Sequence, residues 1–435
     1  MVALWLLAAL LLAVALRAPL GLAMIATGAL GYAHFSSAEA LAAHLATAWP
    51  ARFMSHDLAM VPLFVLMGHL ATRGGLSAAL FAACRAWIGH WRGGLAMAAV
   101  GGCALFGAIS GSSVATASTM ARVALPEMRR HGYGAGLACG TLAAGGTLGI
   151  LIPPSVVLIL YALLTEQNIV TLFLAALLPG LLALAGFVLA IAVTVRIWPD
   201  AAPRHPPCPS ADRWRSFRAI CPAAGIFALV LGGLYGGLFT PAEAACLGVV
   251  LTALAGFRSG ELGWAGLRDS LLDTAVTSAM IFVILFGADM VNVMLALSQL
   301  PQALTGWAGA AGLPPMAVLG LVLLAYLAAG CVLDSLSLVL LTVPVVVPML
   351  MALDFGLSPD QQGLWLGVLM LMAVELGMIT PPVGLNLFVI AATAPEVPAP
   401  VIFRGTLPFL AVELLRLLLL LALPGLSTLP LGGPG

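Results

Sequence analysis

The chain is built from long apolar runs that carry almost no charge, and this feature most limits what it can fold into. Of its 435 residues, 62% are hydrophobic and 8% are charged, against roughly 25% charged in soluble globular proteins. Such a chain cannot cover a water-facing surface, which excludes a soluble enzyme, a disordered protein and a nucleic-acid-binding protein. In lipid, only helices and closed barrels satisfy the backbone, and barrel strands alternate polar with apolar residues. The unbroken runs therefore predict an all-α polytopic membrane protein.

The runs predict about ten membrane-crossing helices, because a bilayer core needs about 20 apolar residues per helix. The first run lacks a basic start and a small-residue cleavage site, so we expect a retained first span and not a signal peptide. The predicted spans are residues 2–16, 19–33, 57–72, 133–163, 170–195, 218–236, 241–257, 271–296, 362–392 and 405–423.

Two further apolar stretches, 93–120 and 313–345, carry polar breaks at their centres, and we expect each to be a re-entrant helical hairpin. The arginines support this topology, because positive residues gather on the cytoplasmic side of membrane proteins and all 17 cations of this chain are Arg. With two hairpins and periplasmic N- and C-termini, nearly every loop arginine is cytoplasmic and only Arg52 lies outside. A full crossing at 93–120 would move Arg122, Arg129 and Arg130 to the other side and break the pattern.

The chain divides into two halves of the same order at a proline-rich polar loop. Each half has a span, a surface segment, a hairpin, a span broken by two prolines and a closing span. The halves start from opposite sides of the membrane, which is the inverted-topology repeat of secondary transporters. We expect scaffold helices in 1–56, a first repeat in 57–197 with surface segment 74–92, a cytoplasmic loop in 198–217, scaffold helices in 218–257, and a second repeat in 258–435 with surface segment 297–312.

Four places put polar groups and irregular backbone at membrane depth, namely residues 106–116, 145–154, 331–337 and 375–386. Non-helical backbone survives there only where protein or a water-filled cavity covers it. Unwound carbonyls and half-helix C-termini coordinate Na⁺, and half-helix N-termini face anionic substrate groups. The alternative is that Gly and Ser only allow close helix packing and that Pro only bends the helices. The symmetric placement of the four breaks favours a binding site.

Ionisable groups at membrane depth indicate function by default. Asp334 lies in a hairpin break, and Glu375, which precedes another break, either serves the site or pairs within the bundle. His69 is interpreted as a satisfied histidine at a helix end. Arg416 follows Glu413 by three residues, so an ion pair on one helix face is possible. The sequence carries no acid–base cluster, metal motif or phosphate loop that would indicate an enzyme or ATP-driven transport.

From about residue 5 to 425, the chain resembles the large membrane subunit of TRAP transporters, the tripartite ATP-independent periplasmic transporters. The resemblance rests on both hairpins and both double-proline breaks. Two departures are Thr116, where many members carry Asp, and Cys331-Val332, where members often have Thr-Phe. The segments that carry the resemblance are LFVLMGHLATRGGLS, FGAISGSSVATASTM, ALPEMRRHGYGAGLACGTLAAGGTLGILIPPS, CVLDSLSLVLLTVPVVVPML and GMITPPVGLNLFV.

The resemblance implies a Na⁺-coupled importer of the bacterial inner membrane that moves an organic anion by an elevator motion. A periplasmic substrate-binding protein would deliver the anion, and a separate small four-helix membrane subunit would brace the large one. One Na⁺ site would use Ser110, Ser113, Gly145, Leu148 and Ile150, and a second would use Asp334, Ser335, Gly377, Thr380 and Pro381. The substrate would lie between the hairpin tips, near Ser112, Ser113, Thr116, Pro154, Ser335 and Asn386.

Two other classes of function stay open from the sequence. A stand-alone Na⁺/organic anion symporter would share the inverted repeat but would need neither partner protein. An intramembrane enzyme or a passive scaffold would need an acid–base or metal cluster, or would show no Na⁺ dependence. The sequence does not name the carboxylate or the Na⁺ stoichiometry, because many ligands would be backbone carbonyls without a side-chain signature.

Overall fold

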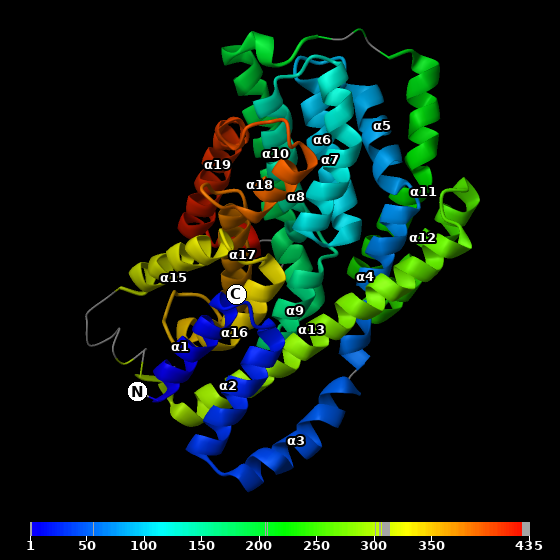
Figure 1. Ribbon diagram of the computed structural model, residues 1–435. Helices are drawn as coiled ribbons and strands as arrows, with labels where there is room; N and C mark the ends of the chain where they lie inside the picture. Colours follow the sequence, from blue (N-terminus) through cyan, green and yellow to red (C-terminus); the bar gives the residue numbers. More distant parts are fainter. Residues whose placement is uncertain are drawn as a thin grey trace.

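The computed structural model describes residues 2–54, 56–204, 206, 208–300, 302–303, 306 and 314–428, and these residues form helices and loops without a strand. The helices stack into an elongated bundle in which long helices alternate with short, broken ones (Figure 1). The all-α prediction is therefore confirmed.

The helices of the N-terminal half follow the apolar runs. They are α1 (Val2–Ala15), α2 (Leu20–Phe35), α3 (Ala38–Phe53), α4 (His56–Arg73), α5 (Leu76–Ile88), α6 (Gly94–Ser110), α7 (Ser113–Arg130), α8 (Ala135–Leu151), α9 (Val156–Thr165) and α10 (Ile169–Ile197), followed by the short 3₁₀ helix η1 (Pro199–Ala201).

The second half repeats this order after two connecting helices. Its helices are α11 (Ser210–Tyr235), α12 (Pro241–Ser259), α13 (Trp264–Ser298), α15 (Pro315–Gly330), α16 (Ser335–Met351), α17 (Pro359–Met378), α18 (Leu385–Thr393), α19 (Ala399–Ala422) and α20 (Gly425–Thr428). The predicted surface segment 297–312 lies largely outside the described residues.

Both halves pack their helices in the same pattern. In the first half α6 and α7 lie on α8, and in the second half α15 and α16 lie on α17. The short helices that follow the breaks cross over, because α9 packs on α16 and α18 packs on α7. The two hairpins and the two broken helices therefore form one interlocked body.

A second body consists of α2, α4, α11, α12 and α13, in which α13 packs along α2 and α4 and α12 packs on both α4 and α11. The contacts of α4 with α6 and α9, and of α13 with α16, join it to the hairpin body. Helix α5 bridges the two, since it contacts α11 on one side and α6 on the other, and it turns away from α4 by 64°. We call these parts the scaffold body and the hairpin body.

The predicted spans differ in how well they meet the length and apolar composition of a membrane-crossing helix. Among the described residues, six helices are long and apolar enough to cross a membrane, or eight if each of two bent pairs counts as one span. Helices α1 and α2 fall short at 14 and 16 residues. At 1.5 Å per residue, α1 spans only about 21 Å of a hydrocarbon core of about 30 Å.

Several predicted boundaries were also wrong. The second arm of the first hairpin continues past residue 120 to Arg130, because its polar end is held by ion pairs such as Arg85 Nη1 to Glu127 Oε2 at 2.7 Å. The second arm of the other hairpin reaches Met351. The loop expected over 198–217 is shorter, since α11 begins at Ser210. Helix α3 lies within the scaffold segment 1–56, between two predicted spans.

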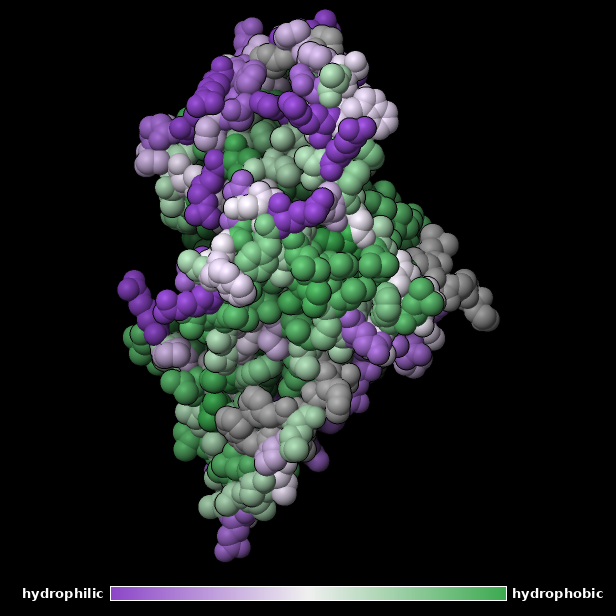
Figure 2. Space-filling model, turned by 90° about the vertical axis from the view of Figure 1, so that its right-hand side faces the viewer, coloured by the Kyte–Doolittle hydropathy of each residue, from purple (hydrophilic) through white to green (hydrophobic). Residues whose placement is uncertain are grey.

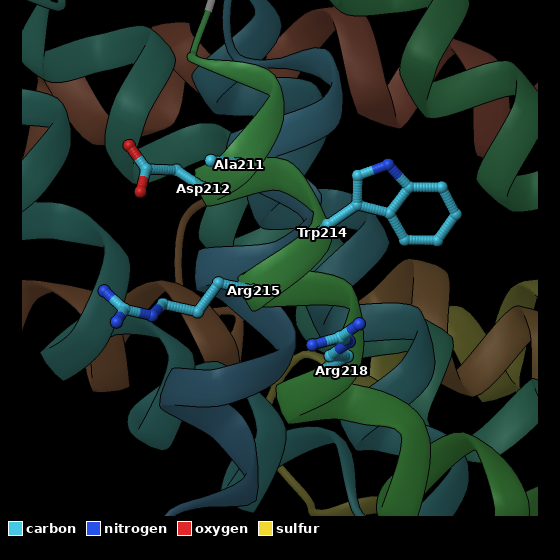
Figure 3. Close-up of a pocket in the computed structure, with 5 residues that line it drawn as sticks. All are labelled: Ala211, Asp212, Trp214, Arg215 and Arg218. Atoms are coloured by element: carbon cyan, nitrogen blue, oxygen red, sulfur yellow. The ribbon is translucent and has the colours of Figure 1, made fainter.

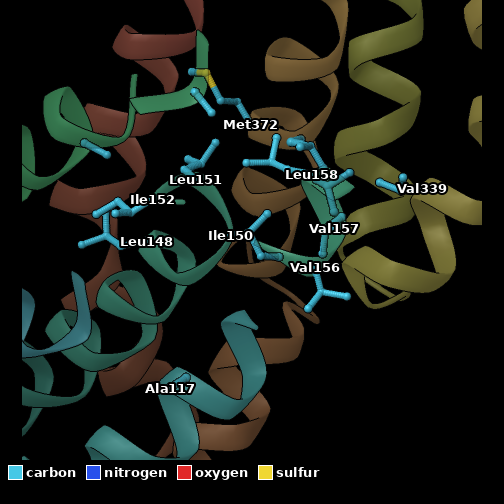
Figure 4. Close-up of a cluster of buried hydrophobic side chains, with 14 of the residues drawn as sticks. Ala117, Leu148, Ile150, Leu151, Ile152, Val156, Val157, Leu158, Val339 and Met372 are labelled. Atoms are coloured by element: carbon cyan, nitrogen blue, oxygen red, sulfur yellow. The ribbon is translucent and has the colours of Figure 1, made fainter. Parts of the chain in front are cut away.

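The core lies around the break between α8 and α9. Figure 4 shows Ile150 of α8 near Val156 and Val157 of α9, while Leu148 lies further away beside Ile152. Val339 of α16 and Met372 of α17 belong to the same cluster of buried side chains. Figure 2 shows hydrophilic residues gathered at the end of the molecule where α10 connects to α11, above a broad hydrophobic band. This distribution is typical of a protein set in a bilayer.

Candidate functional site

The tip of the first hairpin is a tight polar turn. Gly111 has φ of 61° and joins α6 to α7, a left-handed conformation that favours glycine. The Ser112 hydroxyl caps α7 by accepting a hydrogen bond from the Ala115 N–H at 3.4 Å. The hydroxyls of Ser110 and Thr116 lie 2.8 Å apart across the turn. The tip therefore presents several oxygens next to the N-terminus of α7.

The tip of the second hairpin has the same plan with an acidic cap. The Asp334 carboxylate caps α16, because its Oδ2 accepts a hydrogen bond from the Ser337 N–H at 3.1 Å. Ser335 is buried at the first position of that helix. On the facing break, the Thr380 hydroxyl donates back to the Leu376 carbonyl at 2.5 Å. Asp334 and Ser335 thus lie at the hairpin tip, and Thr380 lies at the break that follows α17.

Each hairpin touches its broken helix through a pair of glycines. A Cβ placed on Gly107 would lie 2.5 Å from the Gly149 Cα, and one on Gly330 would lie 3.4 Å from the Gly377 Cα. Gly149 and Gly377 each stand four residues before the first proline of a double proline. Both Pro–Pro bonds, Pro153–Pro154 and Pro381–Pro382, are cis. The two breaks therefore share the same spacing of glycine and prolines and the same cis bond.

A buried hydrogen bond connects the two halves. The Ser113 hydroxyl, next to the first tip, donates to Oε2 of Glu375 on α17 at 2.7 Å, and both residues are buried. Asn386 is also fully buried, and its amide donates to the Ala143 carbonyl at 3.2 Å. Glu375 is the functional candidate that sequence reasoning left open, because its partner lies 262 positions away in the chain.

A cavity of about 200 Å³ lies where the two bodies meet at the hairpin tips. Ser110, Gly111, Ser112 and Ala115 of the first hairpin line it together with Leu336 of the second. The scaffold body contributes His69 and Thr72 from α4 and Thr277 from α13. His69 is therefore placed at this cavity, a position that its helix-end interpretation did not anticipate.

Three helices begin at this cavity. Ser112 is the cap of α7, Val156 is the first residue of α9, and Leu336 is the second residue of α16, and all three line the cavity. The free N–H groups and the dipole at a helix N-terminus attract anions. The cavity therefore offers an anion three helix N-termini and several hydroxyl groups.

The other predicted site residues lie around the cavity or behind it. Of the six predicted substrate residues, Ser112 is among the cavity-lining residues, whereas Thr116 and Asn386 are fully buried in the hairpin body. The remaining predicted residues lie on the broken helices and at their breaks, as follows: Gly145, Leu148 and Ile150 on α8, Pro154 after it, Gly377 on α17 and Pro381 after it.

Two further pairs of ionisable residues lie within the helical bundle. The predicted Arg416–Glu413 ion pair is present, fully buried, and Arg416 Nη1 also donates to the Pro179 carbonyl at 2.9 Å. Asp289 of α13 lies 3.6 Å from His44 of α3. These pairs explain how charged side chains are tolerated inside the bundle.

Paired hairpins, broken helices and a cavity between two bodies define a multi-pass membrane transport protein. Residues 5–426 match the family described as "Tripartite ATP-independent periplasmic transporter, DctM component". The chain belongs to this family, which confirms the resemblance seen in the sequence.

Similar proteins agree with this assignment. The C4-dicarboxylate TRAP transporter large permease protein DctM of Pseudomonas aeruginosa is 35% identical over 86% of this chain and 85% of its own length. The ectoine/5-hydroxyectoine large permease protein UehC of Ruegeria pomeroyi is 32% identical over 82% of each chain. The crystal structure of the Alcanivorax borkumensis YdaH transporter shares the fold, with a TM-score of 0.62, 19% identity and coverage of 87% and 86%.

Proposed function

We propose that the chain is the large, transporting subunit of a TRAP system that imports a small organic anion together with Na⁺. The convergence of three helix N-termini on one cavity carries the proposal, because this arrangement favours a carboxylate. The relatives named for C4-dicarboxylates and ectoines support a small polar organic substrate of this kind.

The coupling ions would bind behind the tips. Na⁺ favours sites that are rich in oxygen atoms and carry little charge, and the two breaks have this character. At the second hairpin, the Asp334 carboxylate would supply one negative charge. Transport would move the hairpin body against the scaffold body, since the cavity lies between them. A small four-helix membrane subunit and a periplasmic binding protein would complete the system in the bacterial inner membrane, with both termini of this chain on the periplasmic side.

Uptake into proteoliposomes tests this proposal. The chain is reconstituted with its small subunit and the cognate binding protein, with and without an inward Na⁺ gradient. We expect uptake only when all three proteins and the gradient are present. Gradient-driven uptake by the chain alone would instead establish a stand-alone Na⁺/organic anion symporter, and uptake without Na⁺ would refute the coupling.

A further inference from the structure

The first three turns of α11 carry a concentration of arginine where the chain passes from a polar loop into an apolar helix. Arg213, Arg215 and Arg218 lie within six residues, and Arg215 and Arg218 are exposed. The helix then continues as one of the six helices long and apolar enough to span a membrane. If this helix crosses the membrane, the arginines would lie at the level of the lipid headgroups.

An open cleft lies against these turns. It has a volume of about 770 Å³ and is lined by Ala211, Asp212, Trp214, Arg215 and Arg218. Figure 3 shows all five residues on α11, with Arg215 and Trp214 extending to opposite sides and Arg218 one turn further along. The cleft is thus bordered by two guanidinium groups and an indole.

No carboxylate neutralises these arginines in an ion pair among the described residues. Within the described part of the chain, Arg73, Arg85 and Arg129 each pair with a carboxylate, whereas no ion pair is found for Arg213, Arg215 or Arg218, and Arg213 Nε is buried without a hydrogen-bond partner. Among the described residues that line the cleft, Asp212 is acidic. The turns therefore keep an excess of positive charge.

The surroundings suit an amphiphile and not a free ion. The Trp214 ring lies against Phe217 and Trp87 at centroid distances of 5.8 and 6.4 Å, an aromatic group of the kind found at membrane interfaces. Gly225 and Gly232 follow Arg218 by one and two heptads, so they lie on the same face of α11, and both are exposed. Nothing lies within 4 Å of a Cβ placed on either glycine. An acyl chain has room to lie along this face.

We propose that this cleft binds the headgroup phosphate of one anionic phospholipid. Arg215 and Arg218 would hold the phosphate, since guanidinium groups bind phosphate oxygens in a bidentate manner, and Trp214 would lie at the glycerol level. The arginine distribution places the cleft in the inner leaflet. The site is separate from the cavity at the hairpin tips and does not depend on which substrate is transported.

Native mass spectrometry of the full chain in detergent tests the site, with phosphatidylglycerol, phosphatidylcholine and inorganic phosphate as the probes. We expect one tight phosphatidylglycerol molecule, weaker phosphatidylcholine binding, and no competition from phosphate. Each arginine near an anionic headgroup adds favourable free energy to lipid binding. Loss of both arginines in R215Q/R218Q should therefore raise the Kd for phosphatidylglycerol about 30-fold. The matched control is R258Q/R268Q, which removes two exposed arginines at the α12–α13 connection.

A charge-conserving variant separates the site from membrane topology. R215K/R218K keeps the positive charges that orient the helix but loses bidentate binding, so its affinity should lie between the wild type and R215Q/R218Q. Equal loss in the control variant, or equal binding of phosphatidylcholine, would overturn the proposal. So would displacement by inorganic phosphate, which would indicate an anion site. Loss of the small subunit from R215Q/R218Q at unchanged lipid affinity would indicate a protein-docking surface.

Discussion

Asp334 combines two roles that a single substitution separates. Its carboxylate caps α16 and also supplies the charge that we assign to the second Na⁺ site. Asn caps a helix as well as Asp does, so D334N should leave the melting temperature nearly unchanged. Loss of a charged ligand should raise the Na⁺ concentration for half-maximal uptake by about tenfold or more.

Uptake titrated against Na⁺ in proteoliposomes measures this effect. D360N, a change in the first turn of α17 outside the hairpin tips, is the control and should titrate like the wild type. Unchanged Na⁺ activation in D334N would remove Asp334 from the Na⁺ site. A large drop in the melting temperature of D334N would show that Asp334 acts as a helix cap and not as an ion ligand.

Ser113 is expected to stabilise the fold through Glu375. S113A removes the 2.7 Å hydrogen bond and leaves the buried Oε2 without its donor, which should cost about 1–3 kcal/mol of unfolding free energy. S118A, in the same helix, removes only a local bond to the Ala115 carbonyl at 3.1 Å and should cost less. Thermal unfolding in detergent compares the two, and equal melting temperatures would show that the Ser113–Glu375 bond contributes nothing.

The sequence could identify polar residues at the breaks but not their partners. Asp334 and Ser113 stand out because polar groups inside apolar runs are costly, and the structure places both at hairpin tips. The partner of Ser113 could not be inferred, because that contact depends on how two halves of the chain interlock. The place of His69 at the cavity could not be inferred for the same reason, since the cavity also needs a hairpin of the other body.

At the scale of the element, the glycine contacts hold each hairpin on its broken helix. G107A would bring a Cβ to 2.5 Å from the Gly149 Cα, and G330A would bring one to 2.8 Å from the Val374 carbonyl oxygen. In both variants the Cβ would meet backbone atoms of the broken helix, which can move only if the two helices separate. We therefore expect a loss of about 1–3 kcal/mol in unfolding free energy, together with loss of uptake.

Matched glycines in the same helices provide the controls. A Cβ on Gly101 of α6 would lie 3.5 Å from Cys84 Sγ, an ordinary contact, and nothing lies within 4 Å of one on Gly320 of α15. G101A and G320A should therefore be neutral or slightly stabilising, because Ala is the better helix former. If all four variants unfold alike in a thermal melt, the glycine contacts do not hold the hairpins.

Elements were easier to predict than their ends. Apolar runs and double prolines located both hairpins and both breaks, because these signals are local. The sequence predicted helices that stop short of the charged segments 121–130 and 210–217, but both segments are helical. They continue as helix because ion pairs cover the end of α7, while the turns of α11 have room to expose their arginines.

For the whole molecule, the separation into two bodies is what the elevator proposal requires. The cavity has walls from both, with Thr277 on α13 and Val65 on α4 in the scaffold body and Leu336 on α16 in the hairpin body. If the hairpin body moves as a unit, linking Thr277 to Leu336 should stop transport. Linking Val65 to Thr277 should not, because both residues belong to the same body.

The experiment uses T277C/L336C and V65C/T277C in a background whose accessible native cysteines are replaced by Ala. Uptake is measured before and after a short bifunctional thiol reagent, and again after reduction. We expect reversible loss of at least about nine-tenths of the uptake in T277C/L336C only, because one covalent link opposes a motion that non-covalent contacts permit. Equal loss in both variants would mean that the reagent merely blocks the cavity. Full uptake in the linked T277C/L336C protein would refute motion between the bodies, since the link then joins parts that never separate during transport.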